Sequence, residues 1–176
     1  MNLRSHRQST RVIVSRSFYL AAISSSLISV NVGQADVPPG LAPAQLDPAV
    51  PSPESVIGHP VGERAARYDA VEDYFLALAQ ASPLVSIQPY GETHEGRKLY
   101  YATITSRENH ARLDQIKSAN AKLADPRKLG SPAEADQIIA TAPAVAWMAY
   151  SIHGDELSGT DASMLVAYYL AAGQDS

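Results

Sequence analysis

The sequence AVAWMAYSIHGDELSG, residues 144–159, decides the fold that we expect for this chain. Its first seven residues are apolar throughout and do not alternate, which is typical of a strand covered on both faces. A polar loop follows, and then a helical pattern over residues 160–172, with Ser158 as the expected N-cap and Gly173 as the expected end. This order of strand, loop and helix predicts an α/β fold, with the loop at the crevice where such sheets bind ligands.

His153 and Glu156 lie in that loop with two residues between them. An imidazole nitrogen and a carboxylate oxygen are two of the three protein ligands of peptidase zinc sites, in which the fourth position holds water. The spacing alone is weak evidence, because the chain's histidines and glutamates give roughly 0.2 such pairs by chance. We expect Gly154 to let the backbone pass close to the site and Asp155 to add a carboxylate to it. On local features, the alternative that His153 and Asp155 only cap the loop or the next helix stays open.

Further elements are expected upstream of this stretch. From Tyr68 the apolar residues repeat at helical spacing, and Pro83 should end that helix. Residues 84–87 and 99–105 are β-prone and enclose a turn-rich stretch, which predicts a hairpin. Shorter helical segments are expected at residues 109–123 and 134–139.

The N-terminus has the features of a secretory signal peptide. Residues 1–35 contain four arginines and no acidic residue, and Gly33 and Ala35 provide the small residues of a cleavage site before Asp36. An uncleaved anchor is the alternative, but the apolar run 17–32 has 16 residues with five serines, short of the roughly 20 that a spanning helix needs. We therefore expect a secreted or periplasmic bacterial protein, cleaved after Ala35, without stable membrane insertion.

A proline-rich segment separates this signal from the folded part. Seven of the twelve prolines lie between residues 36 and 62, where they remove backbone donors and fix φ too often for a helix or a central strand. We expect a linker or prosegment at residues 36–66 and a folded domain at residues 67–176.

Composition excludes several classes of function. The net charge of −4 becomes −8 without the four arginines of the signal peptide, so nucleic acid is not an expected partner. The absence of cysteine excludes a disulfide framework, a thiol nucleophile and a cysteine zinc site.

Two motifs together resemble the zinc carboxypeptidase family, the carboxypeptidase A-like metallopeptidases. GETHEGRKL at residues 91–99 is similar to the segment that precedes the second strand in that family, and HGDELSG at residues 153–159 is similar to its first zinc-ligand motif. The resemblance runs from about Tyr68 to Ser176. It implies an α/β fold with a mixed β-sheet flanked by helices, truncated here after the first zinc-ligand motif.

Residue by residue, the resemblance makes His153 and Glu156 ligands of Zn²⁺. It gives Glu95, Gly96 and Arg97 a mainly structural role, an ion pair and a tight turn in the hairpin. Digestive-type members carry Arg, which helps to bind substrate, where this chain has Asp155. A carboxylate there would repel a substrate carboxylate, so the same subsite is not implied.

The implied function is that of a zinc metallocarboxypeptidase, which removes C-terminal residues from peptide or protein substrates. The family's third zinc ligand, its substrate-binding arginines and its general base lie further along the chain, and no histidine follows His153. No catalytic residue is therefore assigned here, the general base is expected beyond Ser176, and this 176-residue chain alone is expected to be an inactive fragment. Three alternatives remain: a zinc amidohydrolase of the desuccinylase and aspartoacylase type, a cell-wall peptide hydrolase, and a non-catalytic remnant or binding fragment.

Overall fold

The computed structural model describes residues 43–174, all of which lie in one compact unit of the chain, residues 32–176. The expected signal peptide, residues 1–35, and its cleavage site lie outside the described residues and stay predictions. Within the described range, no helix is long and apolar enough to cross a membrane.

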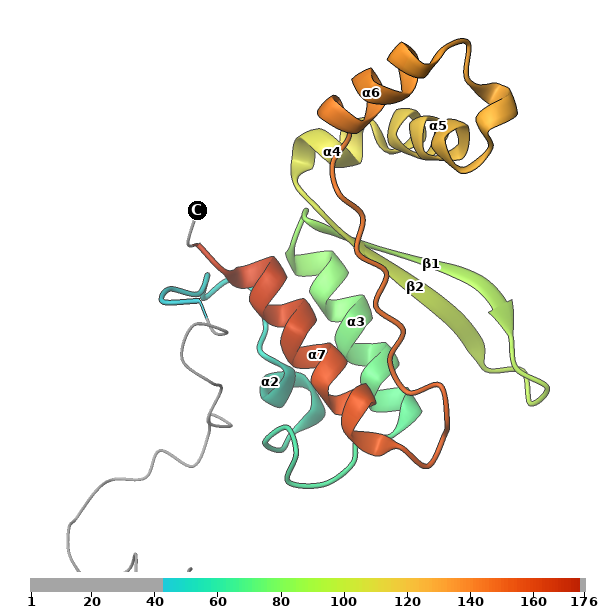
Figure 1. The fold of residues 1–176 in the computed structure, drawn as a ribbon. Helices are drawn as coiled ribbons and strands as arrows, with labels where there is room; N and C mark the ends of the chain where they lie inside the picture. Colours follow the sequence, from blue (N-terminus) through green and yellow to red (C-terminus); the bar gives the residue numbers. More distant parts are fainter. Residues whose placement is uncertain (1–42, 175–176) are drawn as a thin grey trace, which may run out of the picture. The chain divides into compact units, whose positions relative to one another are not determined.

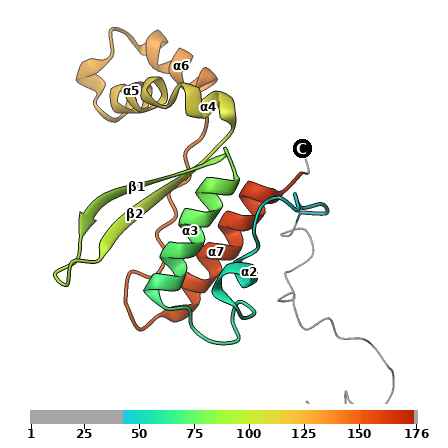
Figure 2. The ribbon, with the colours of Figure 1, turned by 180° about the vertical axis from the view of Figure 1, so that it is seen from behind.

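Two long helices form the centre of the unit. Helices α3 (Tyr68–Ala81) and α7 (Leu157–Ala172) pack side by side, as both ribbon views show (Figures 1 and 2). The expected apolar stripe of α3 points into the core, and Pro83 follows its end as predicted. Helix α7 starts directly after Glu156, so the expectation that Ser158 is its N-cap is wrong. The buried core side chains are those of Val50, Tyr74, Leu78, Val85, Met164, Ala167, Ala171 and Ala172.

The proline-rich segment contributes to this core. A helix, α2 (Pro53–Ile57), begins at a proline in its first turn, and the hydroxyl of Ser52 accepts a hydrogen bond from the amide of Ser55 at 3.3 Å. The expectation that the prolines exclude a helix there is wrong, because proline fits the first helical position, where no backbone donor is needed. Val50 is buried, and the amide of Asp47 donates to the carbonyl of Ala172 at 2.7 Å. The described part of the expected linker is therefore packed against the helices, and its role as a prosegment stays a prediction.

The predicted hairpin is confirmed. Strands β1 (Val85–Glu92) and β2 (Lys98–Ile104) pair antiparallel, with an irregularity between Pro89 and Gly91, and pack against α3 and α7. In the turn, an Arg97 guanidinium nitrogen lies 2.5 Å from a Glu95 carboxylate oxygen, and Gly96 has φ +79°. This arrangement is the ion pair and tight turn that the sequence predicts for this motif.

Shorter helices follow the hairpin. The expected helix at residues 109–123 is broken at Arg112 into α4 (Arg107–Ala111) and α5 (Leu113–Ala124). A 3₁₀ turn, η1 (Pro126–Lys128), and helix α6 (Pro132–Thr141) come next. Helix α6 is longer than the piece expected at 134–139, because Ser131 caps it and Pro132 occupies its first position.

The prediction of a buried central strand at residues 144–150 is wrong. This segment is neither helix nor strand, no backbone hydrogen bond joins it to another described segment, and Trp147 and Val145 are 79% and 67% exposed. A strand covered on both faces needs paired neighbours and packed layers. In the part of the chain that the structure describes, the sheet consists of β1 and β2, which pair with each other. The expected α/β class is confirmed, and the described sheet is two-stranded and antiparallel and packs against helices α3 and α7.

Fluorescence tests the position of Trp147, which is the chain's single tryptophan. Because its side chain is exposed, we expect emission close to that of free tryptophan in water and strong quenching by acrylamide. A buried strand at residues 144–150 would instead give blue-shifted emission and weak quenching. Blue-shifted emission that acrylamide does not quench would contradict the observed position of this segment.

Candidate metal centre

The loop between residue 150 and helix α7 forms a closed turn. The amide of Glu156 donates to the carbonyl of His153 at 3.1 Å. Ser151 opens the loop with φ +57°, a left-handed conformation that residues other than glycine seldom adopt. The hydroxyl of Ser151 lies 3.3 Å from the carbonyl oxygen of His153 and 3.1 Å from that of Glu156. The two ends of the turn are thereby linked through one side chain.

The glycines near this loop have different surroundings. A Cβ on Gly154 would meet nothing within 4 Å in the part of the chain that the structure describes, so the expectation that Gly154 lets the backbone pass close to the site stays a prediction. A Cβ on Gly159 would lie 3.1 Å from the amide nitrogen of Ser151. The close approach is therefore between the loop and the first turn of α7.

The turn brings the two predicted ligands together. The Nδ1 atom of His153 lies 3.2 Å from the Oε1 atom of Glu156, and the side chains are 69% and 64% exposed. Two ligand atoms that each bond one ion at 2.0–2.2 Å in a tetrahedral site lie about 3.4 Å apart. The separation of 3.2 Å is that of a direct contact between imidazole and carboxylate, and it is also compatible with two positions around a zinc ion; both side chains are open to solvent.

No third acidic or histidine side chain joins them among residues 43–174, where no group of three or more could hold a metal. The expectation that Asp155 adds a carboxylate to the cluster is therefore wrong. His94, in the hairpin turn, does not complete the pair either. That His153 and Glu156 are ligands of Zn²⁺ remains a prediction.

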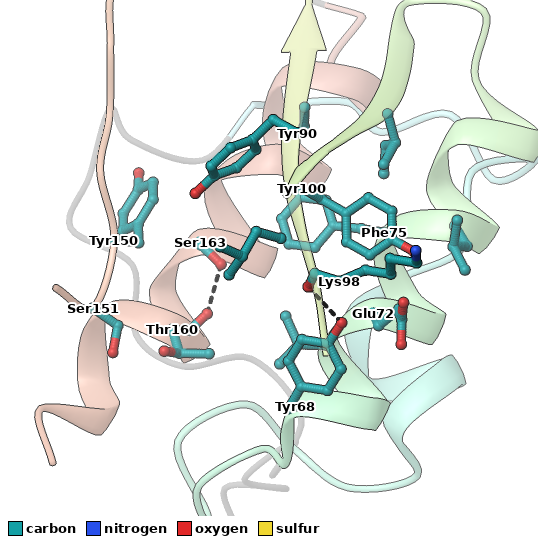
Figure 3. Close-up of a pocket in the computed structure, with 15 residues that line it drawn as sticks. Tyr68, Glu72, Phe75, Tyr90, Lys98, Tyr100, Tyr150, Ser151, Thr160 and Ser163 are labelled. Atoms are coloured by element: carbon teal, nitrogen blue, oxygen red, sulfur yellow. Dashed lines mark hydrogen bonds between the residues drawn. The ribbon is translucent and has the colours of Figure 1, made fainter. Parts of the chain in front are cut away.

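A cavity of about 370 Å³ lies beside this loop, and no pattern in the sequence predicted it. Figure 3 shows Tyr150 and Ser151 on one side of it, with residues of α3 and the hairpin, such as Tyr68 and Tyr100, on the other. The hydroxyl of Tyr68 donates to the carbonyl of Lys98 at 2.8 Å. Ser151 is the part of the candidate metal loop that reaches the cavity. The tyrosines that line the cavity were the one available signal in the sequence. They come from four separate segments, however, and no spacing rule relates residues so far apart in the chain.

Glu72 gives the cavity a polar side. A side-chain hydrogen bond to Glu72 raises the pKa of Tyr100, and burial, together with the Glu72 carboxylate, raises the pKa of Tyr68. Both phenols therefore stay protonated at neutral pH and remain hydrogen-bond donors.

Comparison with known protein families places the sequence of the loop and hairpin within one family profile. A family profile described as zinc carboxypeptidase matches residues 71–176, more than half of the chain. The chain belongs to the zinc carboxypeptidase family. The match spans the hairpin and the loop with His153 and Glu156, and it supports a metallopeptidase type of function. The searches of curated proteins and of solved structures give no match.

Proposed function

We propose that the protein to which this chain belongs is a zinc-dependent metallocarboxypeptidase that removes C-terminal residues from peptides or proteins. The observation that carries the proposal is the convergence of His153 Nδ1 and Glu156 Oε1 at 3.2 Å, within a chain of the zinc carboxypeptidase family. The solvent-exposed position of the pair suits a site that must admit the end of a peptide chain.

The roles of the chain's own residues follow from their chemistry. When bound, zinc lowers the pKa of a water molecule and polarises a substrate carbonyl. His153 and Glu156 would hold the ion through one nitrogen and at least one carboxylate oxygen. The neutral form of His153 is required for this role, because a protonated imidazole has no free lone pair.

The negative charge of Asp155 affects which substrates we expect to bind. Its carboxylate does not join His153 and Glu156 but follows Gly154 in the same loop, and like charges repel each other. The terminal carboxylate of a peptide would therefore be held away from Asp155. A substrate with a basic group at that side would be favoured over an acidic one.

For the 176-residue chain by itself, we propose weak zinc binding and no turnover. Hydrolytic zinc sites use three protein ligands and an open water position, and the pair supplies two. A proton acceptor for the zinc-bound water is also needed, and no residue is assigned that role here.

The experiment that tests the proposed function uses the protein as its own cells produce it. Protein from cells with the unaltered gene and from cells with His153→Ala is assayed on a blocked dipeptide with a free C-terminus. We expect release of the C-terminal residue, its loss with a chelator and its absence in the variant. Equal activity in both would contradict the proposal. Cleavage confined to an N-acylated amino acid or to cross-linked cell-wall peptide would favour the corresponding alternative hydrolase, and no zinc-dependent cleavage would favour a non-catalytic protein.

We also propose export with cleavage after Ala35. The support is the acid-free, arginine-containing sequence of residues 1–35 and the small residues at its end. Mass spectrometry of protein from the periplasm or medium is expected to give Asp36 as the N-terminal residue. Recovery of the Met1 form alone, in the cytoplasm, would refute this prediction.

A further inference from the structure

Ser151 has a backbone conformation that its residue type does not favour. Among residues 43–174 it is the only non-glycine residue with positive φ, at +57°. In that region the Cβ of an L-residue lies too close to the following carbonyl oxygen, so such a conformation persists only where its surroundings determine it. The contacts of Ser151 therefore indicate what holds it.

Two sets of contacts hold Ser151 in this conformation. The hydroxyl of Ser151 is within donor distance of the carbonyl oxygens of His153, at 3.3 Å, and Glu156, at 3.1 Å. These carbonyls belong to the two proposed metal ligands, and the single proton of the hydroxyl lies within reach of both, so the side chain links the two ends of the turn. On its other side, the backbone of Ser151 lies against Gly159 in the first turn of α7, where a Cβ would come within 3.1 Å of the Ser151 nitrogen. The turn is therefore stabilised by contacts of its own side chain and by packing against the first turn of α7.

We propose that Ser151 is a positioning residue that holds His153 Nδ1 and Glu156 Oε1 in their converging arrangement before a metal ion arrives. The inference rests on the proposed function, in which these atoms bind zinc. Ligands that are already arranged lose less conformational freedom when they bind, which raises affinity without an additional bond to the ion. Groups that orient metal ligands typically change affinity by about 10–100-fold when they are removed.

Two substitutions separate the contributions of the hydroxyl and of the backbone. Ser151→Ala removes the hydroxyl and keeps the Cβ, whereas Ser151→Gly removes the hydroxyl and also relieves the left-handed conformation. Ser163→Ala is the matched control, since the hydroxyl of this serine donates within α7, to the carbonyl of Thr160 at 2.6 Å, and not to the carbonyls of His153 and Glu156. Each 176-residue chain is titrated with Co²⁺ alone, followed by calorimetry and by visible absorption, and its fold is checked by circular dichroism.

We expect Ser151→Ala and Ser151→Gly to bind Co²⁺ on the order of tenfold more weakly than the unaltered chain, with a changed visible spectrum at saturation. Ser163→Ala should match the unaltered chain. If Ser151→Gly binds Co²⁺ with unaltered affinity, the proposed role of the hydroxyl is wrong, whatever the result for Ser151→Ala. If Ser151→Ala does not fold, Ser151→Gly alone decides the question. Co²⁺ binding that His153→Ala does not weaken would instead count against the proposed function itself. The two failures are therefore distinguishable.

Discussion

Tyr74→Ala is expected to lower the free energy of unfolding by about 3–5 kcal/mol, the range for removing a large aromatic side chain from a core. The side chain is fully buried, at 0% exposure, between α3 and the core residues of α7 and the hairpin. Its ring also makes an edge contact with Phe75, with centroids 5.7 Å apart. Denaturation by urea, followed by circular dichroism, measures the change.

Tyr74→Phe is the matched control, and we expect it to leave the stability unchanged or to raise it by about 1 kcal/mol. The hydroxyl of Tyr74 is buried without a hydrogen-bond partner among the described residues, and burial raises its pKa. Removing an unpartnered polar group from a core removes a desolvation cost while the packing of the ring is kept. A loss of stability above about 1 kcal/mol in Tyr74→Phe would show that the hydroxyl does have a partner. A loss below about 1 kcal/mol in Tyr74→Ala would contradict the described core.

His153→Ala is expected to weaken zinc binding by the 176-residue chain at least tenfold, at least as much as the loss of an orienting group would. The imidazole is one of two proposed ligands, and its removal leaves only the carboxylate of Glu156. Calorimetric titration with Zn²⁺ at neutral pH measures the affinity. The unaltered chain is itself expected to bind only weakly, so the comparison requires high protein concentrations.

His94→Ala is the control for this second prediction. It removes another exposed histidine, in the hairpin turn, and should leave the zinc affinity as it is. If both substitutions weaken zinc binding equally, zinc binds to exposed histidines without preference. His153 and Glu156 would then not form a defined site. A larger effect of His94→Ala would identify His94 as the ligand in place of His153.

Local patterns in the sequence predicted the elements that need only local contacts. Helix α3 follows from its apolar spacing and from Pro83, and the hairpin follows from two β-prone runs around a turn with Gly96. The convergence of His153 and Glu156 is also local, because a four-residue turn closed by its own hydrogen bond brings both side chains together.

Other features depend on neighbours that are distant in the sequence. An apolar run such as residues 144–150 is a strand only if other strands pair with it, and the run itself does not contain that information. Helix α2 shows the opposite case, since a cap from Ser52 and packing on α3 and α7 outweigh a high proline content. The left-handed conformation of Ser151 and the contact with Gly159 had no signal in residue type, because serine is common in ordinary loops.

X-ray absorption spectroscopy of the zinc-loaded chain tests whether His153 and Glu156 form one metal site. We expect a shell of nitrogen and oxygen atoms at about 2.0–2.2 Å with the multiple scattering of one imidazole per zinc. That imidazole signal should disappear in His153→Ala and persist in His94→Ala. A spectrum with no imidazole, with two or more, or with an unchanged imidazole signal in His153→Ala would show that these two residues do not form the zinc site.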